Sequence, residues 1–355
     1  MMATSSAWRF RPSRLDNIEQ LENYRQGGFH PVSIGDVFCS GRYRILHKLG
    51  FGGFSTVWLA RDKQRDRLVS LKIITAEDSN SCNELRILQH LKQNAKGHPG
   101  CDHTLSLLDH FTIEGPNGCH TCLVSPLGGP DLSQICMYHN PDRSAARRRL
   151  RGALARKFAR QVTLAVEYLH SRGVAHGDVS NSNVLIQLAH VESWADREVY
   201  ELLGSPVTDK VRLFSGELNN MASAPEYVVE TANLSNLESI WFTDKIVLID
   251  FSHSFMLQSP PPEDIAMTMS YCAPEVYFEG QASVWSDIWA LGCTIFEIRA
   301  GRQLFESFLG GSFEVIRQIV RTLGKLPEPC AMLTSMSMEN PKEDSRLVMF
   351  LQSIR

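Results

Sequence analysis

The chain has 355 residues, of which 43% are hydrophobic and 21% charged, and its formal net charge is −3 at pH 7. This length allows two domains or one large bilobal domain with a sizeable core, and the composition is that of a soluble globular protein. A charge balance near zero argues against holding nucleic acid or an anionic membrane by bulk positive charge. Because no stretch approaches the ~20 apolar residues of a membrane span, we expect an intracellular protein.

The N-terminal stretch from Met1 to Arg14 has no apolar segment of the kind that a secretory signal needs, so we expect a disordered tail there. Nine cysteines are dispersed along the chain. The one close pair, Cys119 and Cys122, has a CxxC spacing but no second pair that would complete a zinc site. We therefore expect ordinary reduced thiols.

Strand-like patterns come first along the chain. Three β-rich runs within residues 43–74 are separated by turn residues, which predicts an antiparallel meander. Apolar runs near residues 105–111 and 121–127 would complete a five-stranded sheet. Between them, residues 83–91 predict a helix, because Glu84 and three apolar residues recur at i, i+3, i+4 and i+7 on one face.

Beyond residue 130 the pattern becomes helical. Phe158, Val162, Ala165 and Leu169 form one stripe of a long amphipathic helix that ends before Gly173. Its arginine-rich beginning is either a solvated face, which we favour, or an anion-binding patch. A sheet-rich part followed by a helix-rich part predicts a two-lobe α+β arrangement.

A cluster of glycines lies between the first two predicted strands, at Gly50, Gly52 and Gly53. Missing side chains at Gly50 and Gly52 allow backbone amides to approach a phosphate closely. A glycine-rich hairpin is also a common structural turn, so this signal alone leaves both interpretations open. It is not a Walker A loop, because no Gly-Lys-Ser/Thr opens a helix here.

A lysine and a glutamate stand where each needs a partner. Lys72 lies in an apolar strand, where a buried ammonium requires a counter-charge. Glu84 lies on the apolar face of the predicted helix, where a lone carboxylate is unfavourable. An ion pair between them satisfies both and can hold nucleotide phosphates; the alternative is two unrelated surface charges.

Further polar side chains follow the long helix and a later buried strand. In His176-Gly-Asp-Val-Ser-Asn-Ser-Asn183, Asp178 fits a base that accepts a substrate hydroxyl proton, and Asn183 fits an amide that binds a metal. Asp250 follows an apolar strand, and Mg²⁺ usually takes one or two carboxylates together with nucleotide phosphates. Two short motifs come later, Ala273-Pro274-Glu275 and Asp287-Ile-Trp-Ala-Leu-Gly292.

In this order and context the motifs resemble the eukaryotic protein kinase domain, from about Tyr43 to Pro329. The resemblance implies a bilobal α+β fold, with a small antiparallel N-lobe sheet plus one helix and a mainly helical C-lobe. It also implies ATP as phosphoryl donor and Mg²⁺ as cofactor. The roles implied are catalysis by Asp178, Lys72 and Glu84, and metal binding by Asn183 and Asp250.

The same resemblance assigns the nucleotide and substrate contacts. Val124 would occupy the gatekeeper position, and the backbone of Ser125 and Leu127 would meet the adenine edge. The implied ATP-binding residues are Leu49, Gly50, Phe51, Gly52, Gly53, Phe54, Ser55, Thr56, Val57, Lys72, Val124, Ser125 and Leu127. The implied substrate platform consists of Thr268, which would contact the catalytic loop, and of Ala273, Pro274 and Glu275.

One subfamily resembles the N-terminal part closely. The segments similar to the SR-protein kinases are residues 24–36, 41–43, 48–50 and 54–60. This group phosphorylates serines in Arg/Ser repeats of splicing factors. Ser55, which replaces the third glycine, is a feature of the group, as is a long insertion before the metal-binding strand, here at roughly 188–243.

The expected domain division follows from these boundaries. It comprises an N-terminal extension (1–42), an N-lobe (43–127), a C-lobe (128–329) with the insertion, and a tail (330–355). The helices that normally floor the C-lobe are not recognisable, so we expect either a truncated C-terminus or an incomplete lobe.

Several positions depart from the kinase pattern. Gly177 replaces the arginine that receives an activation-loop phosphate, which predicts activity without such phosphorylation. Ser180 replaces a lysine that neutralises charge on the transferred phosphoryl group. Ser252 stands in place of a glycine, and Cys272 stands where relatives have an arginine.

Three functions follow as hypotheses. The first is a monomeric protein serine/threonine kinase of the cytoplasm or nucleus that acts on Arg/Ser-rich proteins, with no membrane and no direct nucleic-acid contact. The second is a pseudokinase, motivated by Ser180, Cys272 and the short C-lobe. The third is a small-molecule phosphotransferase, whose loop also begins His-Gly-Asp; the motifs 273–275 and 287–292, typical of a peptide platform, argue against it.

Overall fold

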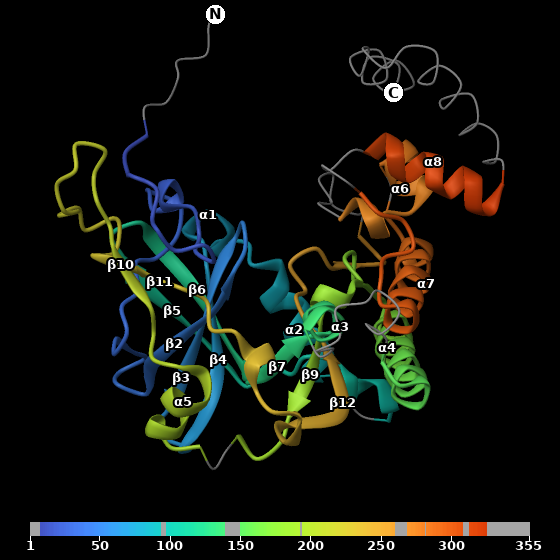
Figure 1. Cartoon of the computed structure of the whole chain (residues 1–355), viewed down its shortest axis with the longest axis horizontal. Helices are drawn as coiled ribbons and strands as arrows, with labels where there is room; N and C mark the ends of the chain where they lie inside the picture. Colours follow the sequence, from blue (N-terminus) through green and yellow to red (C-terminus); the bar gives the residue numbers. More distant parts are fainter. Residues whose placement is uncertain are drawn as a thin grey trace, which may run out of the picture.

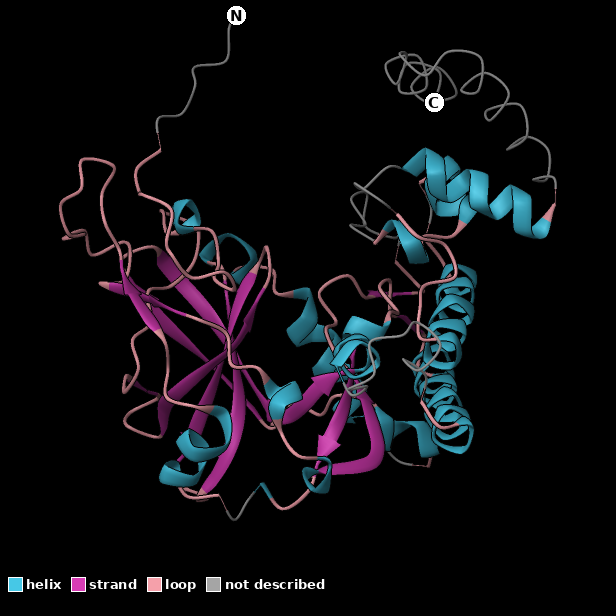
Figure 2. Cartoon of the chain, viewed as in Figure 1, coloured by secondary structure: helices cyan, strands magenta, loops and turns pink. Residues whose placement is uncertain are grey.

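The computed structural model describes residues 8–93, 97–138, 150–191, 194–259, 268–280, 282–307 and 312–324. Within these ranges the chain forms a sheet-rich lobe and a helix-rich lobe that lie side by side (Figures 1 and 2). This arrangement confirms the predicted bilobal α+β fold. The predicted tail, 330–355, lies outside the described residues, as does Pro329.

The sheet-rich lobe is built on one antiparallel sheet with the strand order β1-β2-β3-β4-β6-β5. Its strands are β1 (Val37–Phe38), β2 (Tyr43–Phe51), β3 (Ser55–Asp62), β4 (Arg67–Ile74), β5 (Asp109–Gly115) and β6 (Gly118–Pro126). The meander is as predicted, but the sheet has six strands instead of five, because the short β1 pairs with the beginning of β2. Gly118, with φ +129°, makes the tight β5–β6 turn.

Two helices accompany the sheet, α1 (Ala76–Ser79) and α2 (Asn83–Gln93). The prediction for α2 is confirmed, since Glu84, Ile87, Leu88 and Leu91 are its buried residues. Its apolar side chains join the same core cluster as the long helix of the other lobe. The helix therefore connects the two lobes (Figure 1).

The N-terminal segment is packed, and the expectation of a disordered tail is wrong for residues 8–14. Phe10 is 2% exposed and shares a cluster with Tyr24, Phe29 and Val228. Arg9 also pairs with Glu22 at 2.9 Å. Part of the partner surface, including Val228, comes from the insertion far along the chain, and a local sequence pattern does not reveal contacts of that kind.

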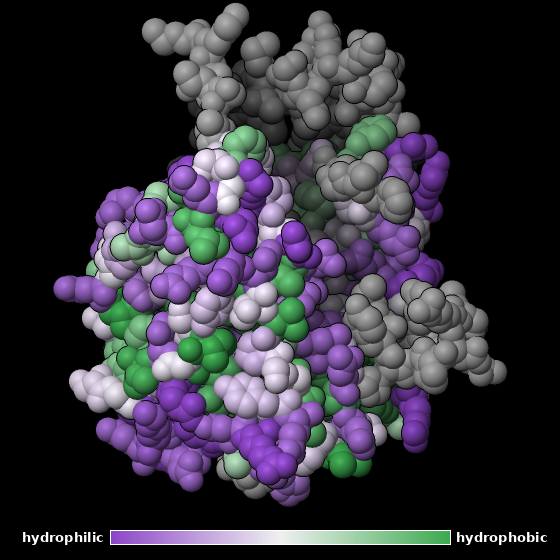
Figure 3. All heavy atoms as spheres, turned by 60° about the vertical axis from the view of Figure 1, so that its left-hand side comes forward, coloured by the Kyte–Doolittle hydropathy of each residue, from purple (hydrophilic) through white to green (hydrophobic). Residues whose placement is uncertain are grey.

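The insertion, predicted at roughly 188–243, forms short helices and strands. Its elements are α5 (Asp196–Leu203), β10 (Thr208–Lys210), β11 (Tyr227–Val229), η6 (Leu234–Asn236) and η7 (Ser239–Trp241). It lies against the sheet lobe: the Tyr227 hydroxyl accepts a hydrogen bond from the Ile34 N–H at 3.0 Å. On the face that Figure 3 turns forward, hydrophilic side chains surround small groups of hydrophobic ones.

A buried ion pair ties the N-terminal segment to the sheet. The Lys48 side chain on β2 has no exposed surface and pairs with Glu19, which is 2% exposed. Tyr24 donates its hydroxyl to the same carboxylate, and the Lys48 ammonium lies 5.7 Å from the Trp58 ring centre. Removing one member of such a pair leaves an uncompensated buried charge.

We therefore expect Lys48→Met to lower the free energy of unfolding by about 3–5 kcal/mol, measured by urea denaturation. Lys63→Met, at an exposed position in the turn between β3 and β4, serves as the control. Adding Glu19→Leu to Lys48→Met should recover part of the loss, because the orphaned carboxylate is then removed. Equal stability of the Lys48 and Lys63 variants would contradict this role.

The helix-rich lobe surrounds the long helix α4 (Gly152–Ser171), whose predicted residues Phe158, Val162, Ala165 and Leu169 have no exposed surface. Arginines 151, 156 and 160, at its beginning, are exposed, which fits a solvated face and an anion-binding patch equally; arginines 147–149 lie outside the described residues. No helix in the described ranges combines the length and apolar character needed to span a membrane.

Small sheets and short helices complete this lobe. The first elements are η2 (Pro99–His103), β7 (Gly128–Asp131), α3 (Leu132–Tyr138), β8 (Val174–Ala175), η4 (Asn181–Asn183) and β9 (Val184–Leu188). The later ones are β12 (Phe242–Leu248), β13 (Phe255–Met256), η8 (Met269–Tyr271), α6 (Pro274–Glu279), α7 (Val284–Ala300) and α8 (Ser312–Leu323). Strands β12, β9 and β7 pair in that order and bring the polar segments after β8 and β12 together beside the sheet lobe.

Candidate active site

A cavity of about 360 Å³ opens between the two lobes. The glycine loop, β4, α2, β6, β7 and the segment after β12 all contribute to its walls. The predicted residues that line it are Leu49, Gly50, Phe51, Gly52, Ser55, Val57, Lys72, Glu84, Ser125 and Asp250. Further lining residues include Leu105, Leu107, Leu123, Pro126, Gly128, Asp131, Ala232 and Leu234. The cavity thus combines apolar walls with one strongly charged end.

Some residues predicted for nucleotide binding do not line this cavity. Gly53 and Phe54 lie at the tip of the glycine loop, where the Phe54 ring contacts that of His253 with 6.3 Å between centres. The side chains of Thr56 and Leu127 are buried elsewhere. Leu127 lies in the short connection between β6 and β7, which we call the hinge, and belongs to an apolar cluster with Leu59 and Leu68.

The gatekeeper expectation for Val124 needs correction. Side chains alternate between the faces of a strand, and on β6 Leu123 and Ser125 face the cavity, as does Pro126 at the end of the strand, whereas Val124 does not. Val124 points to the opposite face, fully buried in the core of the sheet lobe with Val69 and Leu71. Ser125 therefore occupies the cavity wall where Val124 was expected.

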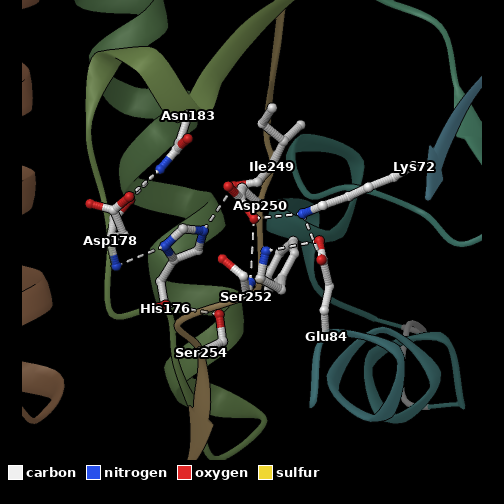
Figure 4. Close-up of polar contacts among 10 residues, drawn as sticks. Lys72, Glu84, His176, Asp178, Asn183, Ile249, Asp250, Ser252 and Ser254 are labelled. Carbon is white, nitrogen blue, oxygen red and sulfur yellow. Dashed lines mark hydrogen bonds and ion pairs between the residues drawn. The ribbon is translucent and has the colours of Figure 1, made fainter. Parts of the chain in front are cut away.

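The charged end of the cavity centres on Lys72. Its ammonium donates to Glu84 Oε2 at 2.6 Å and to Asp250 Oδ1 at 2.8 Å (Figure 4). Burial alone would lower the pKa of Lys72, but the Asp250 and Glu84 carboxylates offset this and raise it. The pKa of Asp250 is lowered in spite of burial, because Lys72 lies beside it, whereas burial raises that of Glu84. The predicted Lys72–Glu84 contact is present, and Asp250 is an additional partner.

Two backbone features fix the position of Asp250. It follows β12, and its φ of +65° turns the chain sharply at the end of that strand. Glu84 Oε1 accepts a hydrogen bond from the Phe251 N–H at 3.2 Å. Glu84 therefore links α2 to the Asp250 turn as well as to Lys72.

Asp178 and Asn183 face one another across the loop after β8 (Figure 4). The Asn183 side-chain amide donates to Asp178 Oδ2 at 2.7 Å and to the Asp178 carbonyl at 2.9 Å. Asp178 Oδ1 is buried and has no hydrogen-bond partner in the described part of the chain. Burial raises the pKa of Asp178, although His176, Asn183 and His253 act in the opposite direction. A free buried carboxylate oxygen is suited to accept a hydroxyl hydrogen.

Asp287 on α7 holds this loop in place, a role that the motif around it did not reveal. Its fully buried carboxylate accepts from the His176 N–H at 2.7 Å and from the Gly177 N–H at 2.9 Å. His170 Nε2 lies 2.9 Å from the same group. His176 in turn contacts the Ile249 carbonyl at 3.1 Å, which connects the loop to the Asp250 strand.

The structure gives a physical reason for the glycine at position 177. Gly177 has φ +79°, and a Cβ atom added there would lie 2.4 Å from the His253 carbonyl oxygen. Any larger residue at this position, including the arginine expected from the kinase pattern, requires the loop or the His253 segment to shift.

The residues predicted for a substrate platform lie away from the cavity. Ala273 is buried and Pro274 opens α6, with Glu275 in its first turn. Thr268 is exposed beside residues 260–267, which lie outside the described ranges. Cys272, which stands where relatives have an arginine, is buried and supplies no cation. Burial raises the pKa of its thiol to about 11.

The donor set fits a nucleotide triphosphate with a divalent cation. Asp250 keeps one oxygen beyond its contact with Lys72, and its side chain is 36% exposed. The Asn183 amide donates through nitrogen, which leaves its carbonyl oxygen for a cation. The Lys72 ammonium supplies the positive charge that phosphates require.

The bilobal fold and the charged cavity between its lobes are those of a protein kinase, and the sequence comparisons agree. The chain belongs to the protein kinase domain family: the model of that family matches residues 43–196 and 234–351. The unmatched residues 197–233 lie inside the range predicted for the insertion. Membership implies ATP as substrate and typically a divalent metal ion.

The relatives point to one subfamily, as predicted. Residues of the chain are 38% identical over 184 positions to protein kinase dsk1 of Schizosaccharomyces pombe, with 49% of this chain and 33% of the relative covered. SRSF protein kinase 3 of Homo sapiens is 31% identical over 224 positions, covering 61% and 37%. Serine/threonine-protein kinase SRPK of Physarum polycephalum is 27% identical over 323 positions, covering 87% and 73%. The matched part of the chain thus spans about a third of the length of the first two relatives.

Proposed function

We propose that this chain is an ATP-dependent serine/threonine kinase that transfers the γ-phosphoryl group of ATP to serine in Arg/Ser-rich proteins such as splicing factors. The observation that carries the proposal is the charged end of the cavity. There Lys72 bridges Glu84 and Asp250 at 2.6 and 2.8 Å, and Asp178, in the adjoining loop, keeps one carboxylate oxygen free. We further propose that the protein acts as a monomer in the cytoplasm or nucleus.

In this mechanism the residues of the site align ATP with the substrate serine and remove the proton of the serine hydroxyl. Asp178 orients the serine hydroxyl and accepts its proton, while Asn183 holds the carboxylate in position. Lys72 binds the phosphates, and Glu84 prevents it from turning away. Mg²⁺, when bound, would be held by Asp250 and Asn183 and would neutralise charge on the phosphates. Phosphoryl transfer then depends mainly on positioning.

With Ser180 in place of a lysine we expect a lower rate of phosphoryl transfer, but not a pseudokinase. Its side chain is 3% exposed within the catalytic loop and carries no charge. Loss of one electrostatic contact to the transferred group lowers turnover by about 10²–10³. The Lys72–Glu84–Asp250 arrangement is intact, and no observation points to binding without turnover.

The proposal is tested with the whole chain, ATP·Mg²⁺ and two peptides that differ only in Arg-Ser against Lys-Ser repeats. We expect mass spectrometry to find phosphoserine, formed faster on the Arg-Ser peptide. Equal rates on both peptides would contradict the substrate class. Phosphoryl transfer only to a free aminoglycoside or amino alcohol would contradict the reaction class.

The rate should also depend on pH through Asp178. Because burial raises the pKa of this carboxyl, its protonated and inactive form persists above the ordinary aspartate value of about 3.9. We expect kcat/KM to rise with pH through a midpoint above that value. Parallel circular dichroism would separate titration from acid unfolding. A folded enzyme whose kcat/KM shows no acid limb above pH ~4 would contradict Asp178 as the base.

A further inference from the structure

The insertion returns to the cavity at one place. Among the described residues of 188–243, Ala232 and Leu234 line the cavity. We name residues 230–237, which contain both, the strap. Ala232 lies outside the ranges that the protein kinase match covers, and Leu234 is the first residue of the second matched range, 234–351. All other lining residues lie within the matched ranges, so Ala232 is the part of the wall that the match does not include.

The strap is fixed on the sheet-lobe side by backbone hydrogen bonds. The Ala232 N–H donates to the Lys48 carbonyl at 2.9 Å, next to Leu49, where the glycine loop begins. The Thr231 N–H donates to the Asn17 carbonyl at 3.1 Å. Both bonds use main-chain atoms, and the Thr231 hydroxyl also donates to the Asn17 carbonyl at 3.1 Å.

On the other side the strap rests on the hinge and the helix-rich lobe. Its one turn of helix, η6, contacts β7 and α3. Leu234 and Leu237 belong to the same apolar cluster as Leu127 of the hinge. The strap therefore crosses from β2 to β7 at the edge of the cavity.

The side chains that the strap presents are apolar. Ala232 and Leu234 each retain 9% exposure, and Leu49 and Val57 line the same cavity. Lys72 and Asp250, which suit phosphates, lie at the charged end, whereas the strap adjoins the hinge. Apolar side chains beside the hinge suit a flat base and its sugar.

We propose that the strap forms an outer wall of the nucleotide site and contacts the adenosine moiety of ATP through Ala232 and Leu234. This inference rests on the proposed function, since it assumes that ATP occupies the cavity. It makes nucleotide affinity a property of the insertion as well as of the kinase lobes.

Two substitutions test the wall. Leu234→Ala removes apolar contact and should weaken ATP binding about 5- to 20-fold. Ala232→Phe, with its backbone hydrogen bond retained, fills the site and should weaken binding at least about tenfold. The matched control is Leu237→Ala, in the same cluster and 3% exposed but not part of the cavity wall, which should leave ATP affinity within about twofold.

The probes separate the strap from general damage to the fold. Affinities of the whole chain for ATP, adenosine and inorganic tripolyphosphate are measured by calorimetry. We expect Leu234→Ala to weaken ATP and adenosine by similar factors and to leave tripolyphosphate unchanged. Equal losses in Leu234→Ala and Leu237→Ala, or unchanged adenosine affinity in both wall variants, would overturn the inference. Wild-type protein that binds no ATP would instead overturn the proposed function.

Discussion

Asp178→Asn is expected to lower kcat for phosphoryl transfer by about 10²–10⁴. The amide has nearly the shape of the carboxylate and can still accept the Asn183 hydrogen bond of 2.7 Å, so the loop should keep its conformation. What is lost is the buried oxygen that has no partner in the described structure and that we assign to the serine hydroxyl. The measurement is the steady-state rate on an Arg-Ser peptide.

The control separates chemistry from binding. ATP affinity and the unfolding midpoint of Asp178→Asn should match the wild type, because Lys72 and Asp250 are unaltered. Asp66→Asn, at a turn position with a 96% exposed side chain, should retain full activity. A variant at 178 that is folded, binds ATP and turns over at the wild-type rate would show that Asp178 is not the base.

Asp287→Asn is expected to lower the free energy of unfolding by about 2–4 kcal/mol and to reduce kcat at least tenfold. The Asp287 carboxylate accepts hydrogen bonds from two backbone N–H groups and contacts the His170 side chain. An amide has only one acceptor oxygen, so its NH₂ group must face a donor in this buried position. The loop that carries Asp178 then loses part of its anchor.

The adjoining position on α7 provides the control for this effect. Ile288 is 46% exposed, and Ile288→Ala should change the free energy of unfolding by less than about 1 kcal/mol, measured by urea denaturation. If Asp287→Asn proved as stable and as active as Ile288→Ala, the three hydrogen bonds would not organise the catalytic loop.

Sequence periodicity located the elements whose pattern is local. Helix α2 and helix α4 have the predicted buried faces, because residues three and four apart share a side of a helix. The Lys72–Glu84 pair was also predictable, since each charge lay at an apolar position. Asp250 as a second partner of Lys72 was not, because its distance from Lys72 depends on how the lobes meet.

Other features depend on contacts between distant segments. Leu105 and Leu107, which the sequence placed in a strand, line the cavity and pack on the main core cluster, and the strand itself begins at Asp109. The error at Val124 has a related origin: the face on which a strand residue lies depends on register, and a shift of one position exchanges the faces. The packing of Phe10 depends likewise on the insertion.

We propose that one triphosphate is held among Lys72, Glu84, Asp178, Asn183 and Asp250. A crystal structure of the chain with a non-hydrolysable ATP analogue and Mg²⁺ tests it most directly. We predict phosphates beside the Lys72 ammonium, the metal ion on Asp250 and Asn183, and the terminal phosphate facing Asp178. An analogue bound outside the cavity, or one whose phosphates point away from Lys72, would contradict the account.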